Sequence, residues 1–216
     1  MIKSVTKSTF DSLLKEKFQG QIPGLAAQLK MVPNPRPGNQ INTEVENSCH
    51  KAGVLILIYP FQNQLHLVLT RRTEKLERHQ AQISFPGGRQ EQGETREQTA
   101  LRETCEELGI HSDTVHVVGH LTPLYIPPTN YCIYPFVAQA DVKPLFTPSP
   151  FEVAEILEIP LIHLLDPQTV RKEVWTLHGA NIEIPFYYFE GHKIWGATAM
   201  VLAEFLEMIQ TMEELL

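Results

Sequence analysis

The chain has few of the features that mark secreted, membrane-spanning or zinc-binding proteins. Its 216 residues contain only three cysteines, Cys49, Cys105 and Cys132. They are too few and too scattered for a disulfide scaffold or a zinc site, which favours a reducing compartment. The longest apolar run, residues 53–60, is far too short to span a bilayer. The N-terminus is polar and charged, unlike a secretory signal. We therefore expect a soluble, cytoplasmic protein with no membrane partner.

A broadly basic surface is lacking as well. The chain carries 18 Lys and Arg against 25 Asp and Glu, a formal net charge of −7, which argues against a general nucleic-acid binder. A nucleotide substrate is still compatible with this charge, because a bound metal ion and a few local arginines can neutralise its phosphates. The sequence also lacks internal repeats, so its length suits one domain with extensions.

Hydrophobic periodicity predicts how the chain is organised. A short amphipathic helix is expected over residues 8–18, followed by a proline-rich segment. We assign residues 1–45 to this helical extension and linker, and residues 46–216 to the main domain. The expected strands are 52–59, 65–70, 83–85, 115–121, 133–140, 151–160, 174–177 and 182–189, with helices at 95–108, 161–165 and 197–215. This order predicts an α+β fold in which helices flank a mixed sheet.

The helix expected over residues 95–108 has clear signals at both ends. Thr95 and Gln98 are spaced as a capping box, and Gly109 stands where a C-cap glycine belongs. Its buried stripe is expected on the side away from Glu103 and Glu107. That stripe would consist of Ala100, Leu101, Thr104, Cys105 and Leu108.

Three glutamates on this helix share one face. Glu103, Glu106 and Glu107 are related by i, i+3 and i+4, so their carboxylates converge. Hard divalent cations take oxygen ligands of this kind beside a substrate phosphate. A solvated acidic face is the plain alternative, because surface acids are common and like charges at this spacing cost only about 0.2–0.5 kcal/mol per pair. The residues around the three glutamates distinguish the two interpretations.

The wider segment resembles the signature of the Nudix hydrolases, Gly-x5-Glu-x7-Arg-Glu-U-x-Glu-Glu-x-Gly-U, in which U is a bulky aliphatic residue. Every fixed glycine and polar position is matched, as is the last aliphatic one. The matching residues are Gly88, Glu94, Arg102, Glu103, Glu106, Glu107, Gly109 and Ile110. The single departure is Thr104 at the first U position, where the threonine methyl can still face the core.

The resemblance implies a Nudix-type α/β/α sandwich and a metal-dependent diphosphate hydrolase. Glu103, Glu106 and Glu107, helped by a backbone carbonyl near Gly87, would bind Mg²⁺ or Mn²⁺ and serve catalysis. Glu94 and Arg102 would form a structural ion pair. The metal ions would neutralise the diphosphate and activate a water for attack on phosphorus. The substrate would be a nucleoside diphosphate linked to another group.

Three further segments resemble the coenzyme A pyrophosphatase branch of this family. Leu69–Thr73 together with Ser84–Gly88 is similar to the segment that precedes the signature in that branch. Glu152–Glu155, ahead of an Ile-Pro-Leu sequence, and Ile194–Ala199 near the C-terminus are similar to it as well. Val68 and Thr73 are mild replacements for a leucine and a serine of the branch. Two positions depart more strongly: Glu77 stands in place of an arginine, and Ala81 in place of a glycine.

The resemblance to this branch implies arginines and glycines that bind the substrate, and one acid that acts as the catalytic base. Arg71, Arg72 and Arg78 would bind phosphate, and Gly87 and Gly88 would let the backbone approach it. Glu152, favoured over Glu155, would be the catalytic base. The alternatives are a pyrophosphatase for ADP-ribose, a dinucleotide or another nucleoside diphosphate derivative, and a non-catalytic module that senses a nucleotide. A homodimer is compatible with the family.

Overall fold

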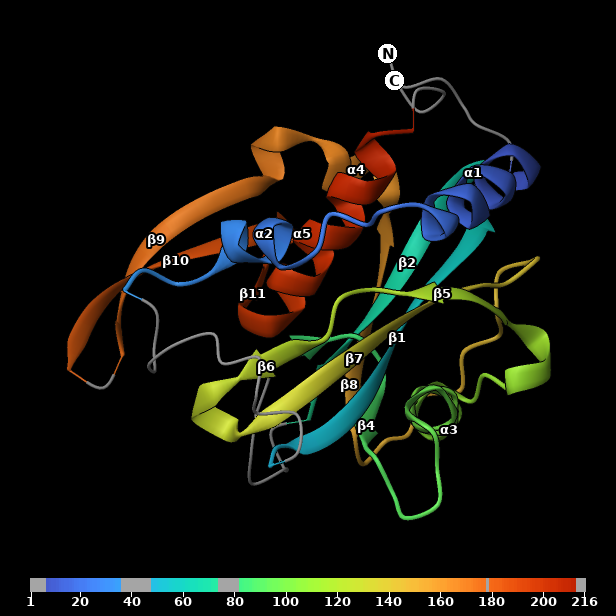
Figure 1. Ribbon diagram of the computed structural model, residues 1–216, viewed down its shortest axis with the longest axis horizontal. Helices are drawn as coiled ribbons and strands as arrows, with labels where there is room; N and C mark the ends of the chain where they lie inside the picture. The colour runs from blue at the N-terminus through green and yellow to red at the C-terminus, as the bar shows by residue number, and fades with distance from the viewer. Residues whose placement is uncertain (1–6, 36–47, 74–81, 178, 213–216) are drawn as a thin grey trace.

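The computed structural model describes residues 7–35, 48–73, 82–177 and 179–212. A mixed β-sheet runs through its middle (Figure 1). The strands β1 (His50–Phe61) and β2 (Gln64–Arg72) form the predicted hairpin, with Gln62 and Asn63 at positive φ in the turn. On its other side β1 pairs with β7 (Tyr131–Gln139), and this pairing is parallel. The other ladders of the sheet are antiparallel, so the expected mixed sheet is confirmed.

The other strands of this sheet are shorter. They are β3 (Ile83–Ser84), β4 (Gly87–Arg89), β5 (His116–His120), β6 (Leu124–Ile126) and β8 (Val153–Pro160). The strand order is β3-β2-β1-β7-β5, while β8 pairs with β2, β4 with β1, and β6 with β7. The sequence did not predict β4, because a Pro-Gly-Gly segment is typical of a strand end. It forms a strand here because its backbone pairs with residues 52–54 of β1.

A second, three-stranded sheet extends from the main body at the left of Figure 1. The predicted late hairpin is present as β9 (Val170–Leu177) and β10 (Ala180–Phe189). A third strand that the sequence did not indicate, β11 (His192–Trp195), pairs with β10. It leads directly into the last helix, α5 (Gly196–Gln210).

Helices cover both faces of the main sheet, as the α/β/α arrangement requires. The helix α3 (Arg96–Leu108) lies on one face, and α1 (Lys7–Gln19), α2 (Leu25–Gln28) and α5 lie on the other (Figure 1). The helix α4 (Leu161–Leu165) follows β8. Four short 3₁₀ turns complete the described helices: η1 (Leu29–Met31), η3 (Ser112–Thr114), η4 (Pro127–Thr129) and η5 (Pro167–Thr169).

The side chains of β1 alternate between two hydrophobic cores. Leu55 and Leu57 pack beneath α3, whereas Ile56 and Ile58 pack with α1 and α5. A strand buried on both faces gives the continuous apolar run seen in the sequence. The helix α3 is therefore packed directly against one face of β1.

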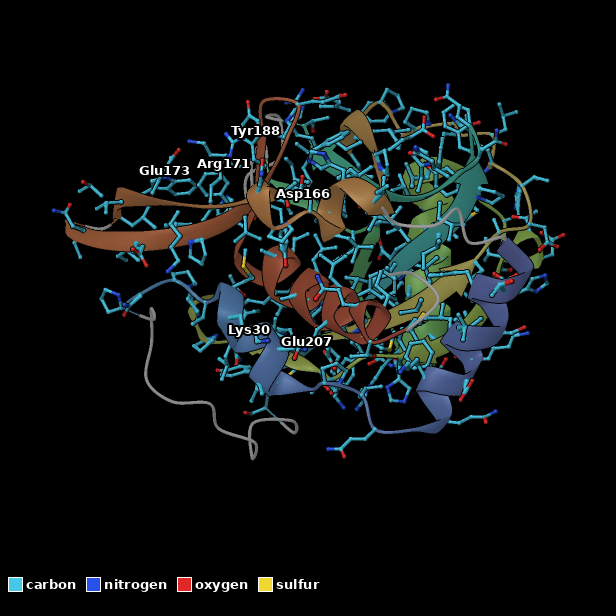
Figure 2. The ribbon with its side chains drawn as sticks, turned by 90° about the horizontal axis from the view of Figure 1, so that it is seen from above. Lys30, Asp166, Arg171, Glu173, Tyr188 and Glu207 are labelled. Carbon is cyan, nitrogen blue, oxygen red and sulfur yellow. A yellow bond between two sulfur atoms is a disulfide. The ribbon has the colours of Figure 1, made fainter. Side chains whose placement is uncertain are left out.

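The N-terminal segment packs as part of the domain. Phe10 and Leu14 of α1 are fully buried in the core shared with α5. Lys30 of η1 pairs with Glu207 of α5 at 2.7 Å, and both side chains are labelled in Figure 2. The predicted boundary near residue 45 lies outside the described residues.

Two of the three cysteines form a disulfide, Cys49–Cys132. The sequence interpretation took the three cysteines as too few and too scattered for a disulfide scaffold, and these two are 83 positions apart. The parallel pairing of β1 with β7 brings them together, since it places Lys51 opposite Cys132. The cysteine argument for a reducing compartment is therefore wrong. Within the described residues, no helix is long and apolar enough to cross a membrane.

Candidate active site

The helix α3 has the predicted ends. Thr95 Oγ1 accepts a hydrogen bond from the Gln98 backbone N–H at 3.1 Å, and the Gln98 side chain accepts one from the Thr95 N–H at 2.8 Å. Gly109 ends the helix at φ 72°, and its N–H donates to the Cys105 carbonyl. These caps confirm the helix boundaries and set the register in which the glutamates leave the helix.

The buried face of α3 differs from the expected stripe. Ala100, Thr104 and Leu108 are buried as predicted, but Leu101 and Cys105 are only partly buried. Glu107 is 2% exposed, although an exposed carboxylate was expected. The reason is tertiary: the Glu107 carboxylate lies against the Gly87 N–H of β4 and against Arg72 of β2, which come from distant parts of the chain.

The glycines of β4 lie directly against the carboxylates of α3. The Gly87 N–H donates to Glu107 Oε2 at 3.3 Å. A β-carbon on Gly88 would overlap the carboxyl group of Glu103, so only glycine admits this close approach. Gly87 and Gly88 are therefore brought together with two of the predicted metal-binding glutamates.

An ion pair braces the loop that precedes α3. Arg102 Nε donates to Glu94 Oε1 at 2.6 Å, and Thr99 Oγ1 donates to Glu94 Oε2 at 2.9 Å. The hydrogen bond from Arg102 lowers the pKa of Glu94 to about 2. Arg102 Nη1 also reaches Glu103 at 3.0 Å and Glu106 at 3.1 Å. The predicted structural ion pair is confirmed, and its arginine also contacts two of the other glutamates.

Four carboxylates influence one another at this site. Burial raises the pKa of Glu107 to about 8, with Glu152 and Glu103 adding to the rise and Arg72 and the Gly87 N–H opposing it. Burial also raises the pKa of Glu103, with Arg102 opposing and with Glu106 and Glu152 adding to it. Such crowding of negative charge is relieved by a bound cation.

The donor chemistry fits a hard divalent ion, which takes carboxylate oxygens. As the side chains stand, no three carboxylate, imidazole or thiol groups within the described residues lie close enough together to hold one. Glu106, whose side chain is 54% exposed, points to Arg102 rather than to Glu107. We infer that binding an ion requires Glu106 to leave Arg102.

Glu152 reaches the cluster from outside the helix. It interacts electrostatically with Glu103 and Glu107. Glu155, the other acid weighed as a base, faces a different neighbour: it accepts a 2.7 Å hydrogen bond from Arg71 Nε and lies 3.2 Å from His192 Nε2. The hydrogen bond from Arg71 lowers the pKa of Glu155. Of the two acids, Glu152 is the one whose charge raises the pKa values of Glu103 and Glu107.

Comparison with known proteins identifies the family. Residues 50–177, more than half of the chain, match the NUDIX domain. The chain belongs to the Nudix family. A NudL Nudix hydrolase from Yersinia enterocolitica, itself uncharacterised, is 32% identical over 179 residues, which cover 81% of this chain and 87% of the relative. The uncharacterised NudL of Photorhabdus laumondii is 31% identical over 184 residues, covering 85% and 94%.

Among solved structures, the Nudix hydrolase RenU from M. smegmatis is similar over 77% of this chain and 89% of its own, at 17% identity and a TM-score of 0.49. A likeness this weak carries no functional inference. The family assignment rests on the domain match and on the curated relatives, which together support a Nudix pyrophosphohydrolase.

The three arginines expected to bind the Nudix substrate have different surroundings. Arg71 is held by Glu155, as described above. Arg72 Nη1 lies 3.8 Å from Glu107 Oε1, and its buried Nε has no hydrogen-bond partner within the described residues. Arg78 falls outside the described residues. The structure thus places Arg72 beside the Nudix carboxylates and Arg71 in a separate ion pair.

Several residues of the branch-like segments are structural rather than exposed to a ligand. Phe85 and Thr70 are buried, with exposed fractions of 3% and 1%. The Pro86 carbonyl accepts a hydrogen bond from the Leu55 N–H, and Thr198 Oγ1 donates to the Ile83 carbonyl. These contacts hold the Pro-Gly-Gly segment against β1 and α5, and so they position the Nudix glycines.

Sequence reasoning missed the contacts that orient Glu152. The Thr73 N–H donates to the Glu152 carbonyl at 3.0 Å, and Thr73 Oγ1 donates to the Phe151 carbonyl at 2.8 Å. Thr73 follows β2, which carries Arg72. The only signal in the sequence was that Thr73 replaces a serine of the branch pattern, and a hydroxyl is all that this contact needs.

Proposed function

We propose that this Nudix hydrolase cleaves the diphosphate bond of coenzyme A or an acyl-coenzyme A, with Mg²⁺ or Mn²⁺, to give 3′,5′-ADP and a 4′-phosphopantetheine compound. The observation that carries the proposal is the placement of the Glu103 and Glu107 carboxylates against the backbone of Gly88 and Gly87, with the charge of Glu152 acting on both. This is a cluster of oxygen donors next to a backbone that can approach phosphate closely.

In this proposal Glu103, Glu106 and Glu107 hold the metal, together with backbone oxygen near Gly87. A divalent ion there supplies charge neutralisation for the diphosphate and Lewis acidity towards water. Glu106 is free to turn inwards because its side chain is 54% exposed. Arg102, paired with Glu94, stays behind as the brace of the loop.

Glu152 is proposed as the general base. It accepts the proton of the attacking water, and it suits this role because its backbone is held by Thr73 while its charge faces the α3 carboxylates. Arg72 is proposed to bind a substrate phosphate oxygen. Its side chain is 29% exposed and its Nη1 lies 3.8 Å from Glu107, so the guanidinium is placed beside the proposed metal ligands.

Coenzyme A is proposed as the substrate because three segments resemble the coenzyme A pyrophosphatase branch. They are the segments around Thr70–Arg72, Phe85–Gly88 and Ile194–Ala199. Its extra 3′-phosphate also requires more cationic contacts than a simple nucleotide does, and Arg71, Arg72 and Arg78 are suited to supply them. The departures at Glu77 and Ala81 favour the second candidate, a pyrophosphatase for ADP-ribose or another nucleoside diphosphate derivative. A cytoplasmic location and a homodimer stay predictions.

The test is a substrate panel of coenzyme A, acetyl-coenzyme A, ADP-ribose, NADH and nucleoside triphosphates, incubated with Mg²⁺ or Mn²⁺ and separated by chromatography. We expect 3′,5′-ADP from coenzyme A, and at least a hundredfold loss of turnover (roughly the scale of one lost transition-state contact) in Glu106→Gln. The matched control is Glu97→Gln, an exposed glutamate in the first turn of the same helix.

Cleavage of ADP-ribose or NADH in place of coenzyme A would change the proposed substrate but leave the proposed diphosphate hydrolysis in place. Full turnover by Glu106→Gln would show that this cluster is not the catalytic site. Metal binding without turnover of any compound would favour a nucleotide-sensing module.

A further inference from the structure

A cavity of about 310 Å³ lies on the α5 side of the molecule. Its wall includes buried apolar side chains from three elements, Met31 of η1, Leu164 of α4 and Leu206 of α5. Of the described residues proposed to act on the diphosphate, none lines it. Pockets that bind small molecules have this composition, a mostly apolar lining with a few polar groups, and their volumes begin at about 300 Å³. The cavity therefore has the size for a small organic ligand.

Tyr187 of β10 presents an unused hydroxyl to this cavity. The residue lines the cavity and is only 5% exposed. Its hydroxyl makes no hydrogen bond to any described residue, yet its oxygen is not sealed from solvent. Burial, with a smaller effect from the charge of Glu207, raises the pKa of Tyr187 to about 12, so the phenol is neutral at pH 7. A polar group left unpaired in an apolar environment costs free energy, which a hydrogen bond to a ligand would offset.

Three charged side chains line the cavity, and their sum is negative. Lys30 comes from η1, Asp166 from the junction of α4 and η5, and Glu207 from α5, and all three are labelled in Figure 2. Lys30 Nζ is held by Glu207 Oε2 at 2.7 Å. Asp166 accepts a hydrogen bond from the Gln168 N–H at 2.9 Å, but it has no ion-pair partner among the residues that the structure describes. One negative charge is thus left without a counter-charge beside an apolar cavity.

These charges select the sign of the ligand. A protonated amine can pair with the carboxylate of Asp166, and the Tyr187 hydroxyl can accept a second hydrogen bond from it. A carboxylate or phosphate would be repelled by Asp166 and Glu207, and the cation at this cavity, Lys30, already has a partner. An uncharged molecule would use the apolar wall alone and would leave Asp166 unpaired.

We propose that this cavity binds a small apolar amine in its protonated form, with its hydrocarbon part against Met31, Leu164 and Leu206 and its ammonium group at Asp166. The site is distinct from the carboxylate cluster, because α5 and α3 lie on opposite faces of the main sheet (Figure 1). The proposal does not rest on the hydrolysis of any diphosphate, so binding alone tests it.

Calorimetric titration of the full-length protein at pH 7 compares three probes: hexylamine, hexan-1-ol and hexanoate. They share one hydrocarbon chain and differ only in the polar head. For hexylamine we expect saturable binding to one site in the millimolar range, the scale for a ligand this small. Hexan-1-ol should bind about tenfold more weakly, because it lacks the charge that pairs with Asp166. Hexanoate should show no saturable binding.

Three variants test the parts of the site, and a fourth is the control. Asp166→Asn keeps the oxygen that caps η5 but removes the charge, so hexylamine should bind about tenfold more weakly while hexan-1-ol binds as before. Tyr187→Phe removes only the hydroxyl and should weaken hexylamine binding about threefold. Ala203→Leu adds a side chain to the cavity wall and should abolish binding of both probes. The control is Asp113→Asn, an exposed aspartate of η3 beside α3, which should leave the dissociation constant unchanged.

Hexanoate that binds as tightly as hexylamine would overturn the proposal, as would unchanged hexylamine binding in Asp166→Asn or a lack of saturable binding by the wild type. An equal loss in Asp166→Asn and Asp113→Asn would overturn it too, since the amine would then respond only to the net charge of the protein. If Ala203→Leu failed to fold, these two surface variants would still decide. Hydrolysis of coenzyme A takes no part in the measurement, so failure of the proposed function would leave these results unaffected.

Discussion

The carboxyl group of Glu103 lies where a β-carbon on Gly88 would be. The two residues are 15 positions apart in the sequence, yet the pairing of β4 with β1 and the packing of α3 on β1 press them together. The glycine of the Nudix signature thus makes room for the carboxyl group of Glu103, which we propose binds the metal.

Gly88→Ala should therefore displace the Glu103 carboxylate and reduce turnover by at least tenfold, because a displacement of about one ångström in a catalytic group is enough for a large loss of rate. Circular dichroism and the melting temperature should show a folded protein. Gly20→Ala is the control, since its added methyl would lie 3.6 Å from the Lys17 carbonyl, an ordinary contact. Full activity of Gly88→Ala would mean that Glu103 is dispensable.

The ion pair of Glu94 with Arg102 predicts a dependence of stability on pH. The folded pKa of Glu94 is lowered to about 2 from a model-peptide value near 4.5, so the pair stabilises the fold fully above pH 4.5. That stabilisation is lost as the pH falls from 4.5 towards 2. Glu94→Gln should lower the unfolding free energy by about 1 kcal/mol at pH 7. Urea unfolding at pH 7, 5 and 3 checks this: a difference from the wild type that fails to shrink at low pH would contradict it.

The disulfide Cys49–Cys132 should contribute to stability by limiting the unfolded chain. Its loop of 83 residues suggests a loss of about 2–4 kcal/mol in Cys49→Ser, and a lower melting temperature when the wild type is reduced. Cys105→Ser is the matched control, because Cys105 is the free cysteine and should leave both quantities unchanged. If dithiothreitol had no effect on the wild-type melting temperature, the two cysteines would not be bonded in solution.

A buried carboxylate joins the N-terminal segment to the last helix. Glu204 is fully buried and accepts hydrogen bonds from the Gly24 N–H, from Gln28 Nε2 and from Thr122. In Glu204→Gln an amide donor would face these donors, so the unfolding free energy should fall by about 2–3 kcal/mol. Glu207→Gln on the same helix, which breaks only the exposed pair with Lys30, should cost at most about 1 kcal/mol. Equal losses in urea unfolding would contradict the assigned role of Glu204.

Much of the fold and part of the site could be predicted from local signals. The caps at Thr95 and Gly109, the hairpin at Gln62 and the three long helices α1, α3 and α5 depend on turn chemistry and periodicity, which act between neighbours in sequence. The strand β4 and the disulfide could not be predicted in this way. Both arise because β1 collects partners from distant parts of the chain.

By itself, the sequence determined the arrangement of the glutamates that we propose carry the chemistry. The spacing of Glu103, Glu106 and Glu107 on one helix follows from the 3.6-residue period alone. Only the tertiary structure decided their surroundings. It buried the Glu107 carboxylate against Gly87 and Arg72, and it left Glu106 paired with Arg102. It also brought the charge of Glu152, which directly precedes β8, to act on Glu103 and Glu107. Burial and charge proximity are set by packing between distant segments, and no local pattern encodes them.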